Sequence, residues 1–360
     1  MKKTITLLLA VMMCFGLMSC GKNNTENDAN NTETYEIAMI TGAGSINDKS
    51  INQKTWEGII AYADVNKLTC KYYDPAAQTS EARLEAIQSA IEKGAKILIT
   101  PGNEFADAVY EAQDLYPEAD FVLIDGEAHD STGSDYKTSQ NTTCVLFAEE
   151  EAGYLAGYAA VKDGYTKLGF IGGEDVPAII RYGYGFVQGA NDAAVEKGIY
   201  IEMKYKYSGV SDASTEIQAT AASWYGEGTE VIFGCGGKLA EAVISAAKMA
   251  GTKAIGMDID PSATDGIVVT SAMKEVGTAV QMILEKYYDE KFPGALTTTL
   301  TAADNAVGLP IGSSQFRTFT ASEYESVYDK LAKGYITIPR DTDVASADLL
   351  TLTNVRVSIR

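Results

Sequence analysis

Ala95-Lys96-Ile97-Leu98-Ile99-Thr100 is a short apolar stretch of the kind that forms a buried β-strand. Helix-like patterns lie on both sides of it, at 80–93 and 104–115, and a second strand-like run follows at 121–124. Short β-branched runs between helical patterns are typical of a parallel sheet with helices on both faces. The stretch therefore predicts an α/β fold, and the same alternation continues in both directions along the chain.

Two similar series of elements follow one another. The first also contains expected strands at 35–40, 68–73 and 142–147 and an expected helix at 50–65. In the second, we expect helices at 149–162, 176–196, 216–225, 239–250 and 275–288 and strands at 167–171, 199–207, 230–233, 253–258 and 267–271. The tail to Arg360 is predicted to be irregular, apart from a hairpin-like pair (297–301 with 305–309) and a helix at 321–333. Two such series predict two lobes with a cleft between them, and ligands of such sheets bind at the carboxyl ends of the strands.

The N-terminal segment has the features of an export signal. Two lysines precede an apolar stretch, 5–18, which is shorter than the roughly 20 residues that a spanning helix needs. Leu17-Met18-Ser19-Cys20 looks like a bacterial lipobox, in which the cysteine is lipidated and becomes the new N-terminus. We therefore expect a signal peptide over 1–19, a lipid on Cys20 and a flexible polar linker over 20–34. An ordinary secretory signal cut near the same place is the alternative.

The composition limits the class of partner. A formal net charge of −20 argues against nucleic acid and against an anionic membrane surface, since both bind clustered Lys and Arg. Hydrophobic residues make up 46% of the chain, which is enough for a sizeable core. Cys70, Cys144 and Cys235 lie far apart and form no C-x-x-C pair, so we expect buried thiols and no metal site.

Two glycine-containing loops resemble cofactor motifs but depart from them. In the loop 41–50, Asn47 stands where a dinucleotide fingerprint has its third glycine. In Gly234-Cys235-Gly236-Gly237-Lys238, Ile232 and Leu239 stand where a phosphate-binding loop needs Gly and Ser or Thr. No cofactor is expected. No G-x-S-x-G, H-E-x-x-H or cysteine–histidine constellation is present either, so the sequence predicts no enzyme.

Polar residues at strand ends are candidates for ligand contact. Asn47, Asp48 and Ser50 lie at the N-terminus of an expected helix, where they either cap it or bind a ligand. Asp125 follows one expected strand, and Asp258 and Asp260 follow the strand residues 253–257 of another. A carboxylate from each lobe, facing one cleft, suits the vicinal hydroxyls of a sugar. By contrast, Glu149-Glu150-Glu151 begins a helix and complements its dipole, so we interpret these acids as structural.

Several segments, in their order, resemble the basic membrane protein family, lipoprotein substrate-binding subunits of ABC transporters that include purine-nucleoside receptors. The most specific are Asn47-Asp48-Lys49-Ser50-Ile51-Asn52-Gln53 and Glu149-Glu150-Glu151-Ala152-Gly153-Tyr154. Further matches are Ile124-Asp125-Gly126, Ile255-Gly256-Met257-Asp258-Ile259-Asp260 and Thr270-Ser271-Ala272-Met273-Lys274.

The resemblance implies a type I periplasmic-binding-protein fold, two doubly wound parallel-sheet lobes joined by a three-crossing hinge. We expect the crossings near Phe147, near Met273 and near 292–295. The first lobe would then contain 35–147 plus 274–295, and the second 148–273 plus 296–360.

The resemblance also implies roles for single residues. Asp125, Asp258 and Lys274 would hold a ribose, Asn47 and Asp48 would contact the base, and the backbone near Gly236 would line the pocket. The family's nucleoside binders have two phenylalanines that stack on the purine, and here these positions are Ile51 and Val210. Tyr182, Tyr184 or Phe147 would have to supply a substitute ring.

From these features we expect a lipid-anchored, monomeric binding protein on the outer face of the cell membrane. It would capture a nucleoside, with a purine base the first choice, and deliver it to ABC permease subunits. The alternatives are a binder of another small ligand, such as a sugar or a flavin, and a surface nucleoside hydrolase.

Overall fold

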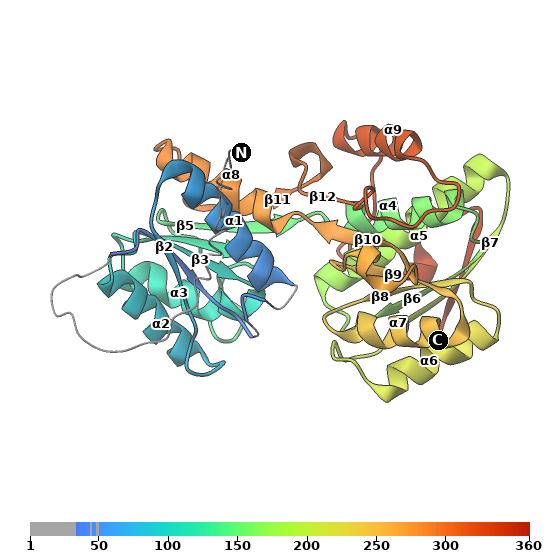
Figure 1. The fold of residues 1–360 in the computed structure, drawn as a ribbon, viewed down its shortest axis with the longest axis horizontal. Helices are drawn as coiled ribbons and strands as arrows, with labels where there is room; N and C mark the ends of the chain where they lie inside the picture. Colours follow the sequence, from blue (N-terminus) through green and yellow to red (C-terminus); the bar gives the residue numbers. More distant parts are fainter. Residues whose placement is uncertain (1–33, 44, 48–49) are drawn as a thin grey trace, which may run out of the picture. The chain divides into compact units, whose positions relative to one another are not determined.

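The structure, a computed structural model, describes residues 34–43, 45–47 and 50–360. The expected signal peptide, Cys20, the linker up to residue 33 and Asp48 lie outside the described residues. Two sheets are formed, one of six strands and one of seven (Figure 1). We call each sheet with its helices a lobe, the six-stranded one first. The α/β class with two parallel-sheet lobes is confirmed.

The first sheet is entirely parallel, with the order β11-β5-β4-β3-β1-β2. Its strands are β1 (Ile37–Ile40), β2 (Cys70–Tyr73), β3 (Ile97–Pro101), β4 (Asp120–Ile124), β5 (Thr142–Phe147) and β11 (Leu296–Leu300). Its helices are α1 (Ile51–Asn66), α2 (Ser80–Glu92), α3 (Ala106–Leu115) and α8 (Val276–Tyr288), with a 3₁₀ turn at Asn103–Phe105.

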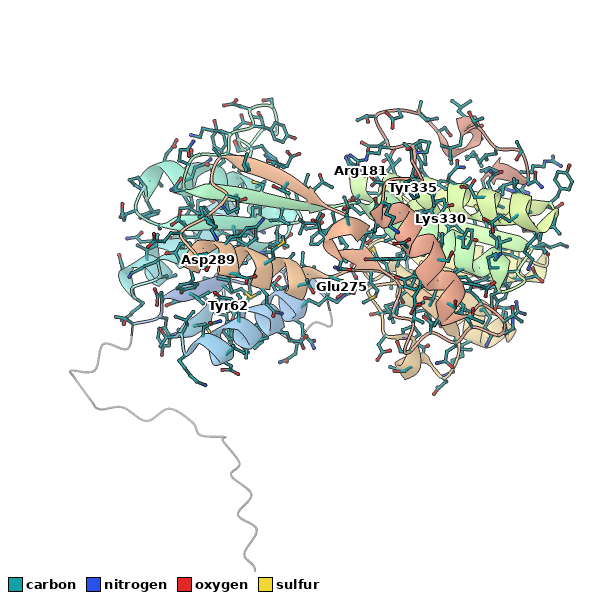
Figure 2. The ribbon with its side chains drawn as sticks, turned by 90° about the horizontal axis from the view of Figure 1, so that it is seen from above. Tyr62, Arg181, Glu275, Asp289, Lys330 and Tyr335 are labelled. Carbon is teal, nitrogen blue, oxygen red and sulfur yellow. The ribbon has the colours of Figure 1, made fainter. Side chains whose placement is uncertain are left out.

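Alternate residues of these strands face different helices. Ile37 and Met39 of β1 belong to the core cluster that contains Ile59 of α1, whereas Ala38 and Ile40 belong to the cluster with α2 and α3. On the first of these faces α1 and α8 pack side by side although they are far apart in the chain: Tyr62 stacks on Tyr288 next to Asp289 (Figure 2). Both faces of the sheet are thus covered.

The second sheet has the order β12-β10-β9-β8-β6-β7-β13 and is parallel except for β12. Its strands are β6 (Lys167–Gly172), β7 (Ile201–Tyr207), β8 (Val231–Cys235), β9 (Lys253–Met257), β10 (Val268–Lys274), β12 (Val307–Gly308) and β13 (Val355–Ile359). Its helices are α4 (Glu149–Lys162), α5 (Pro177–Lys197), α6 (Thr215–Gly226), α7 (Leu239–Ala250) and α9 (Ala321–Ala332), with 3₁₀ turns at Pro261–Thr264, Ala302–Asp304 and Ala347–Leu349.

The tail differs from the prediction. The predicted hairpin is wrong, because β11 pairs in parallel with β5 of the first sheet and β12 pairs antiparallel with β10 of the second. Residues 296–300 therefore belong to the first sheet and not to the second lobe, where the sequence analysis placed them. The end of the chain is not irregular either, since β13 pairs in parallel with β7.

The chain passes between the two sheets at three places. It leaves the first sheet after Phe147, returns after Lys274, and leaves again after Leu300 and not near 292–295 as predicted. Backbone hydrogen bonds join these crossings, from Ala148 N to Leu300 O (2.9 Å) and from Glu275 N to Ala306 O (2.8 Å). The three crossings therefore lie side by side. That they act as a hinge stays a prediction.

Cysteine burial follows the prediction in two cases. All three described thiols are free, and those of Cys144 and Cys235 are buried, whereas Cys70 on the edge strand β2 is half-buried. No helix in the part of the chain that the structure describes has the length and apolar character to span a bilayer.

Small residues let α4 and α5 approach each other closely. The sequence predicts a small-residue face on α4 (Ala152, Gly153, Ala156, Gly157 and Ala160) that packs closely against its sheet. In the structure Gly153 and Gly157 of this face contact the backbone of α5 instead. A Cβ added to Gly153 or Gly157 would overlap the carbonyl oxygen of Tyr182 or Phe186, and one added to Gly185 would overlap that of Glu150. These glycines are required by contact with backbone, which cannot move aside as a flexible side chain can.

Gly157→Ala is expected to lower the free energy of unfolding by about 1–3 kcal/mol, because overpacking outweighs the better helix propensity of alanine. Gly226→Ala is the matched control, since an added Cβ at this end of α6 has no neighbour within 4 Å. Denaturant unfolding measures both, and equal stabilities of the two variants would contradict the close approach of α4 and α5.

Candidate functional site

Two aspartates occupy equivalent positions in the two lobes. Asp125 follows β4 and Asp258 follows β9, each directly at the carboxyl end of its strand. Both have left-handed backbone conformations, with φ of 63° and 56°, which are uncommon for residues other than glycine. Their amides donate to strand carbonyls of the neighbouring strand, from Asp125 to Val145 (2.7 Å) and from Asp258 to Ala272 (3.1 Å). Strained backbone of this kind is concentrated at functional sites, so both positions are candidates.

Lys274, the last residue of β10, connects the two aspartates. Its Nζ donates to Asp125 Oδ2 (2.6 Å), and its backbone N donates to Asp258 Oδ1 (3.1 Å). Burial by itself lowers the pKa of Lys274, but the carboxylates of Asp125, Glu149 and Asp258 outweigh burial and raise it. The lysine is therefore charged, and three residues that the sequence singled out lie together.

Phe147 and Tyr182 are close to this group but present no open ring. Both are fully buried, and the Lys274 Nζ lies 5.8 Å from the centroid of Phe147. Tyr184 is buried too and donates its hydroxyl to the carbonyl of Val344 in the tail. None of the three supplies the substitute stacking face in this structure. The hydroxyl of Tyr182 is instead buried without a hydrogen-bond partner among the described residues. Buried polar groups of this kind usually have a partner.

Glu149 belongs to the same cluster, although the sequence analysis interpreted this residue as structural. It begins α4, is buried, and lies 3.9 Å from the Lys274 Nζ through Oε1. Burial raises its pKa to about 7, and Asp125 adds to the increase, although Lys274 and Arg181 oppose it. Its Oε2 has no hydrogen-bond partner among the residues that the structure describes, and it is 3.7 Å from Arg181 Nη1. Glu149 therefore belongs to the same cluster of ionisable groups as Lys274 and Asp125.

Arg181 links this carboxylate to the tail. Its Nε donates to Asp341 Oδ1 (2.7 Å), while its Nη1 faces Glu149. Figure 2 marks Arg181 on α5. Nothing in the sequence points to it, because its partners are 32 positions before it and 160 after it along the chain.

Lys54 is the other residue that the sequence analysis missed. Its Nζ reaches Asp258 Oδ1 at 2.9 Å, and so joins α1 of the first lobe to the end of β9 in the second. One local signal exists: a lysine in the first turn of a helix opposes the helix dipole, and α1 has no acidic residue there to compensate.

Three further candidates, Asn47, Ser50 and Asp260, are less central to the cluster around Lys274. Asn47 is exposed, with its amide donating to the Ser45 hydroxyl (3.2 Å), and Ser50 lies exposed directly before α1. Asp260 caps the 3₁₀ turn Pro261–Thr264 by accepting from the Ser262 amide (3.0 Å). Contact of Asn47 and Ser50 with a ligand stays a prediction.

Gly236 forms the turn between β8 and α7. Its φ of 124° lies in the region that favours glycine, and an added Cβ would approach the Gly173 amide at 3.1 Å. This glycine therefore allows the tight turn into α7, while its place in the pocket lining stays a prediction.

The two positions where an aromatic ring is expected lie on different lobes. Ile51 begins α1 and is partly buried against the main core cluster, whereas the side chain of Val210, after β7, is 48% exposed. Neither can stack on a base as a phenylalanine does.

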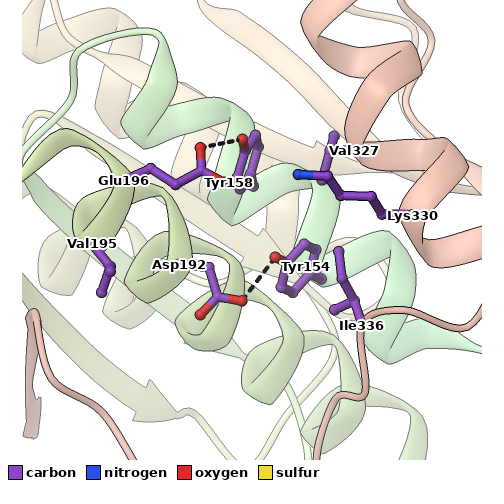
Figure 3. Close-up of a pocket in the computed structure, with 8 residues that line it drawn as sticks. All are labelled: Tyr154, Tyr158, Asp192, Val195, Glu196, Val327, Lys330 and Ile336. Carbon is purple, nitrogen blue, oxygen red and sulfur yellow. Dashed lines mark hydrogen bonds between the residues drawn. The ribbon is translucent and has the colours of Figure 1, made fainter.

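A pocket of about 290 Å³ lies elsewhere, between α4, α5 and α9 (Figure 3). In it the hydroxyl of Tyr154 donates to Asp192 (2.9 Å) and that of Tyr158 to Glu196 (2.6 Å). None of the candidate residues lines it, and its carboxylates already have donors. Among the described residues there is also no group of three or more His, Cys, Asp or Glu that could hold a metal ion.

Comparison with known proteins shows the family to which the chain belongs. Residues 35–342 match a model of the Bmp family, described as ABC transporter substrate-binding proteins, PnrA-like. The chain belongs to this family. It is 31% identical to the ABC transporter nucleoside-binding protein BmpA of Lactococcus lactis, across 94% of this chain and 99% of that protein. A CD4+ T-cell-stimulating antigen of Listeria innocua is 25% identical with the same coverage.

Solved structures share the fold. A solute-binding protein of an ABC transporter system from Aeropyrum pernix has a TM-score of 0.68 at 20% identity, with 87% of this chain and 95% of that chain covered. One from Conexibacter woesei has a TM-score of 0.70 at 16% identity, with 85% and 99% covered. Substrate-binding proteins of the Bmp family work outside the cytoplasm and are not enzymes.

Proposed function

We propose that this chain captures a nucleoside, with a purine base the first choice, and delivers it to ABC permease subunits. The observation that carries the proposal is the pair of aspartates at matching strand ends of the two lobes, both bound by Lys274. Carboxylates in this position accept hydrogen bonds from the hydroxyls of a ribose. Contacts from both lobes to one ligand would drive lobe closure about the three crossings.

The charges of the site favour a neutral ligand. Asp125, Glu149 and Asp258 face Lys54 and Lys274, while the other nearby cation, Arg181, is hydrogen-bonded to Asp341. A phosphate would require cations in excess of the carboxylates. This balance supports a nucleoside or a sugar over a nucleotide.

A sugar is the second candidate ligand. It is favoured by Ile51 and Val210, because stacking of a base on an aromatic ring is worth about 1–3 kcal/mol per base and neither side chain provides a ring. A flavin would need such a face as well. The relative from Lactococcus lactis is named as a nucleoside-binding protein, which supports the nucleoside.

The proposal includes the location and the state of the protein. A lipid on Cys20 and the linker after it would keep a monomeric receptor on the outer face of the membrane, which raises its concentration near the permease. We further propose that the chain has no enzymatic activity, since the sequence contains no catalytic motif that we recognise. Mass spectrometry of the membrane fraction would test the lipid on Cys20.

Calorimetry with a panel of nucleosides and sugars tests the ligand. We expect a nucleoside to bind at least in the micromolar range. Asp258→Asn should weaken nucleoside binding about 10- to 100-fold, which corresponds to the free energy of a hydrogen bond to a charged group. Asparagine tolerates the left-handed backbone of this position. The control is Asp265→Asn, at an exposed left-handed position. Nucleosides that bind no tighter than millimolar would contradict the proposal.

A further inference from the structure

The contact between Lys54 and Asp258 occupies the carboxylate that a ligand would use. The Lys54 Nζ lies 2.9 Å from Asp258 Oδ1, and the backbone N of Lys274 donates to this same oxygen at 3.1 Å. The two side chains of the ion pair are 21% and 16% exposed. The pair is therefore partly shielded from water but open to competition by a ligand.

The number of acceptor sites on the Asp258 carboxylate limits how a ligand can bind while Lys54 is in contact with it. A carboxylate has about four lone-pair sites, two on each oxygen. Lys54 and Lys274 together fill those of Oδ1, and no hydrogen bond to Oδ2 is found within the described residues. One ligand hydroxyl can bind Oδ2 without any rearrangement. Two vicinal hydroxyls that bind the carboxylate through both oxygens need one of the Oδ1 donors to leave.

Only one of these donors can leave. The Lys274 amide is fixed in β10, which pairs with β9 and β12 on its two sides. Lys54 has a flexible four-carbon side chain, so the ammonium can turn away while α1 keeps its place. The charge of Asp258 is then available to the ligand in full.

We propose that Lys54 is a specificity-determining residue, which a vicinal diol displaces from Asp258 and a ligand with a single hydroxyl leaves in place. The inference rests on the proposed function, because it assigns the ribose hydroxyls to Asp258. Lys54 acts as an internal competitor, so the site binds ribonucleosides less tightly than its carboxylates alone would, and it discriminates less against deoxynucleosides.

The test compares wild type with Lys54→Met, using adenosine, 2′-deoxyadenosine and 3′-deoxyadenosine in calorimetry. We expect the variant to bind adenosine about fivefold more tightly, as the loss of a partly exposed competing ion pair implies. Both deoxy compounds should bind within twofold of wild type. Lys54→Gln should behave as Lys54→Met does, and Lys96→Met, an exposed lysine before β3 at the opposite end of the strands, should change nothing.

The possible outcomes separate the two proposals. Adenosine binding that is unchanged or weaker in Lys54→Met and Lys54→Gln, or an equal gain for adenosine and both deoxy compounds, overturns the role of Lys54 and leaves the nucleoside function standing. No measurable binding of any of the three compounds to wild type or variant overturns purine nucleoside capture, and the role of Lys54 with it.

Discussion

Lys274→Met is expected to lower the free energy of unfolding by about 3–5 kcal/mol at pH 8, the usual cost of removing one partner from a buried ion pair. The methionine side chain fills a similar volume, so the loss reports on charge. Without the ammonium, Asp125 Oδ2 loses the hydrogen bond from Lys274, and Glu149 loses one of the two cations beside it, with Arg181 remaining. The pair is buried on the lysine side, where only 8% of the side chain is exposed, so water cannot replace the lost contact.

The effect of Lys274→Met should depend on pH. At pH 5 Glu149 is protonated and needs no cation, because its pKa lies near 7 in the wild type and rises further when Lys274 is removed. The destabilisation should therefore be smaller at pH 5 than at pH 8. Urea unfolding at the two pH values measures this difference.

Two further variants control for the loss of a lysine as such. Lys96→Met should cost less than about 0.5 kcal/mol, because Lys96 is exposed and its nearest carboxylate is 4.0 Å away. Asp125→Asn added to Lys274→Met should recover part of the stability, since it removes the charge that was left unpaired. A loss below about 1 kcal/mol for Lys274→Met, equal at both pH values, would show that these carboxylates do not depend on the lysine.

The strand-and-helix order of the chain could be predicted because each element satisfies a local rule. The predicted bounds 142–147, 149–162 and 239–250 agree with β5, α4 and α7, where apolar runs and helical periodicity both end at polar or turn residues. The tail could not be predicted in this way. β11 finds its partner, β5, about 150 positions earlier in the chain, and β13 pairs with β7, so pairing and not local pattern decides where these strands lie.

The site shows the same division. That Asp125, Asp258 and Lys274 lie together could be predicted, because strand ends of a parallel sheet converge and because the family resemblance names these positions. Lys54 and Arg181 could not, because both lie on helices and reach their partners only through the packing of distant elements. Glu149 is a different case. An acid in the first turn of a helix satisfies a local rule by itself, which hides its second role as a buried partner of Lys274 and Arg181.

That second role gives Glu149→Gln a distinct pH signature. Burial raises the pKa of this carboxyl from 4.5 in the unfolded chain to about 7 in the folded protein. Between these values the folded state holds the proton more tightly than the unfolded state does, so the stability contributed by the neutral form is full below pH 4.5. It is lost as the pH rises to about 7 and stays lost above this value. The total is about 3 kcal/mol, since each pKa unit is worth about 1.4 kcal/mol.

Glutamine cannot lose a proton, so the variant lacks this term. We expect wild type to lose about 3 kcal/mol relative to Glu149→Gln between pH 4.5 and pH 8, measured as free energy of unfolding in urea. Altered hydrogen bonds to the glutamine amide would change the free energy of unfolding of the variant by the same amount at each pH. Such a change therefore does not affect the difference between pH 4.5 and pH 8. Glu202→Gln, an exposed position on β7, is the matched control and should follow the wild-type profile. If the profiles of wild type and Glu149→Gln ran parallel, Glu149 would be ionised throughout, and Lys274 and Arg181 would compensate its burial in full.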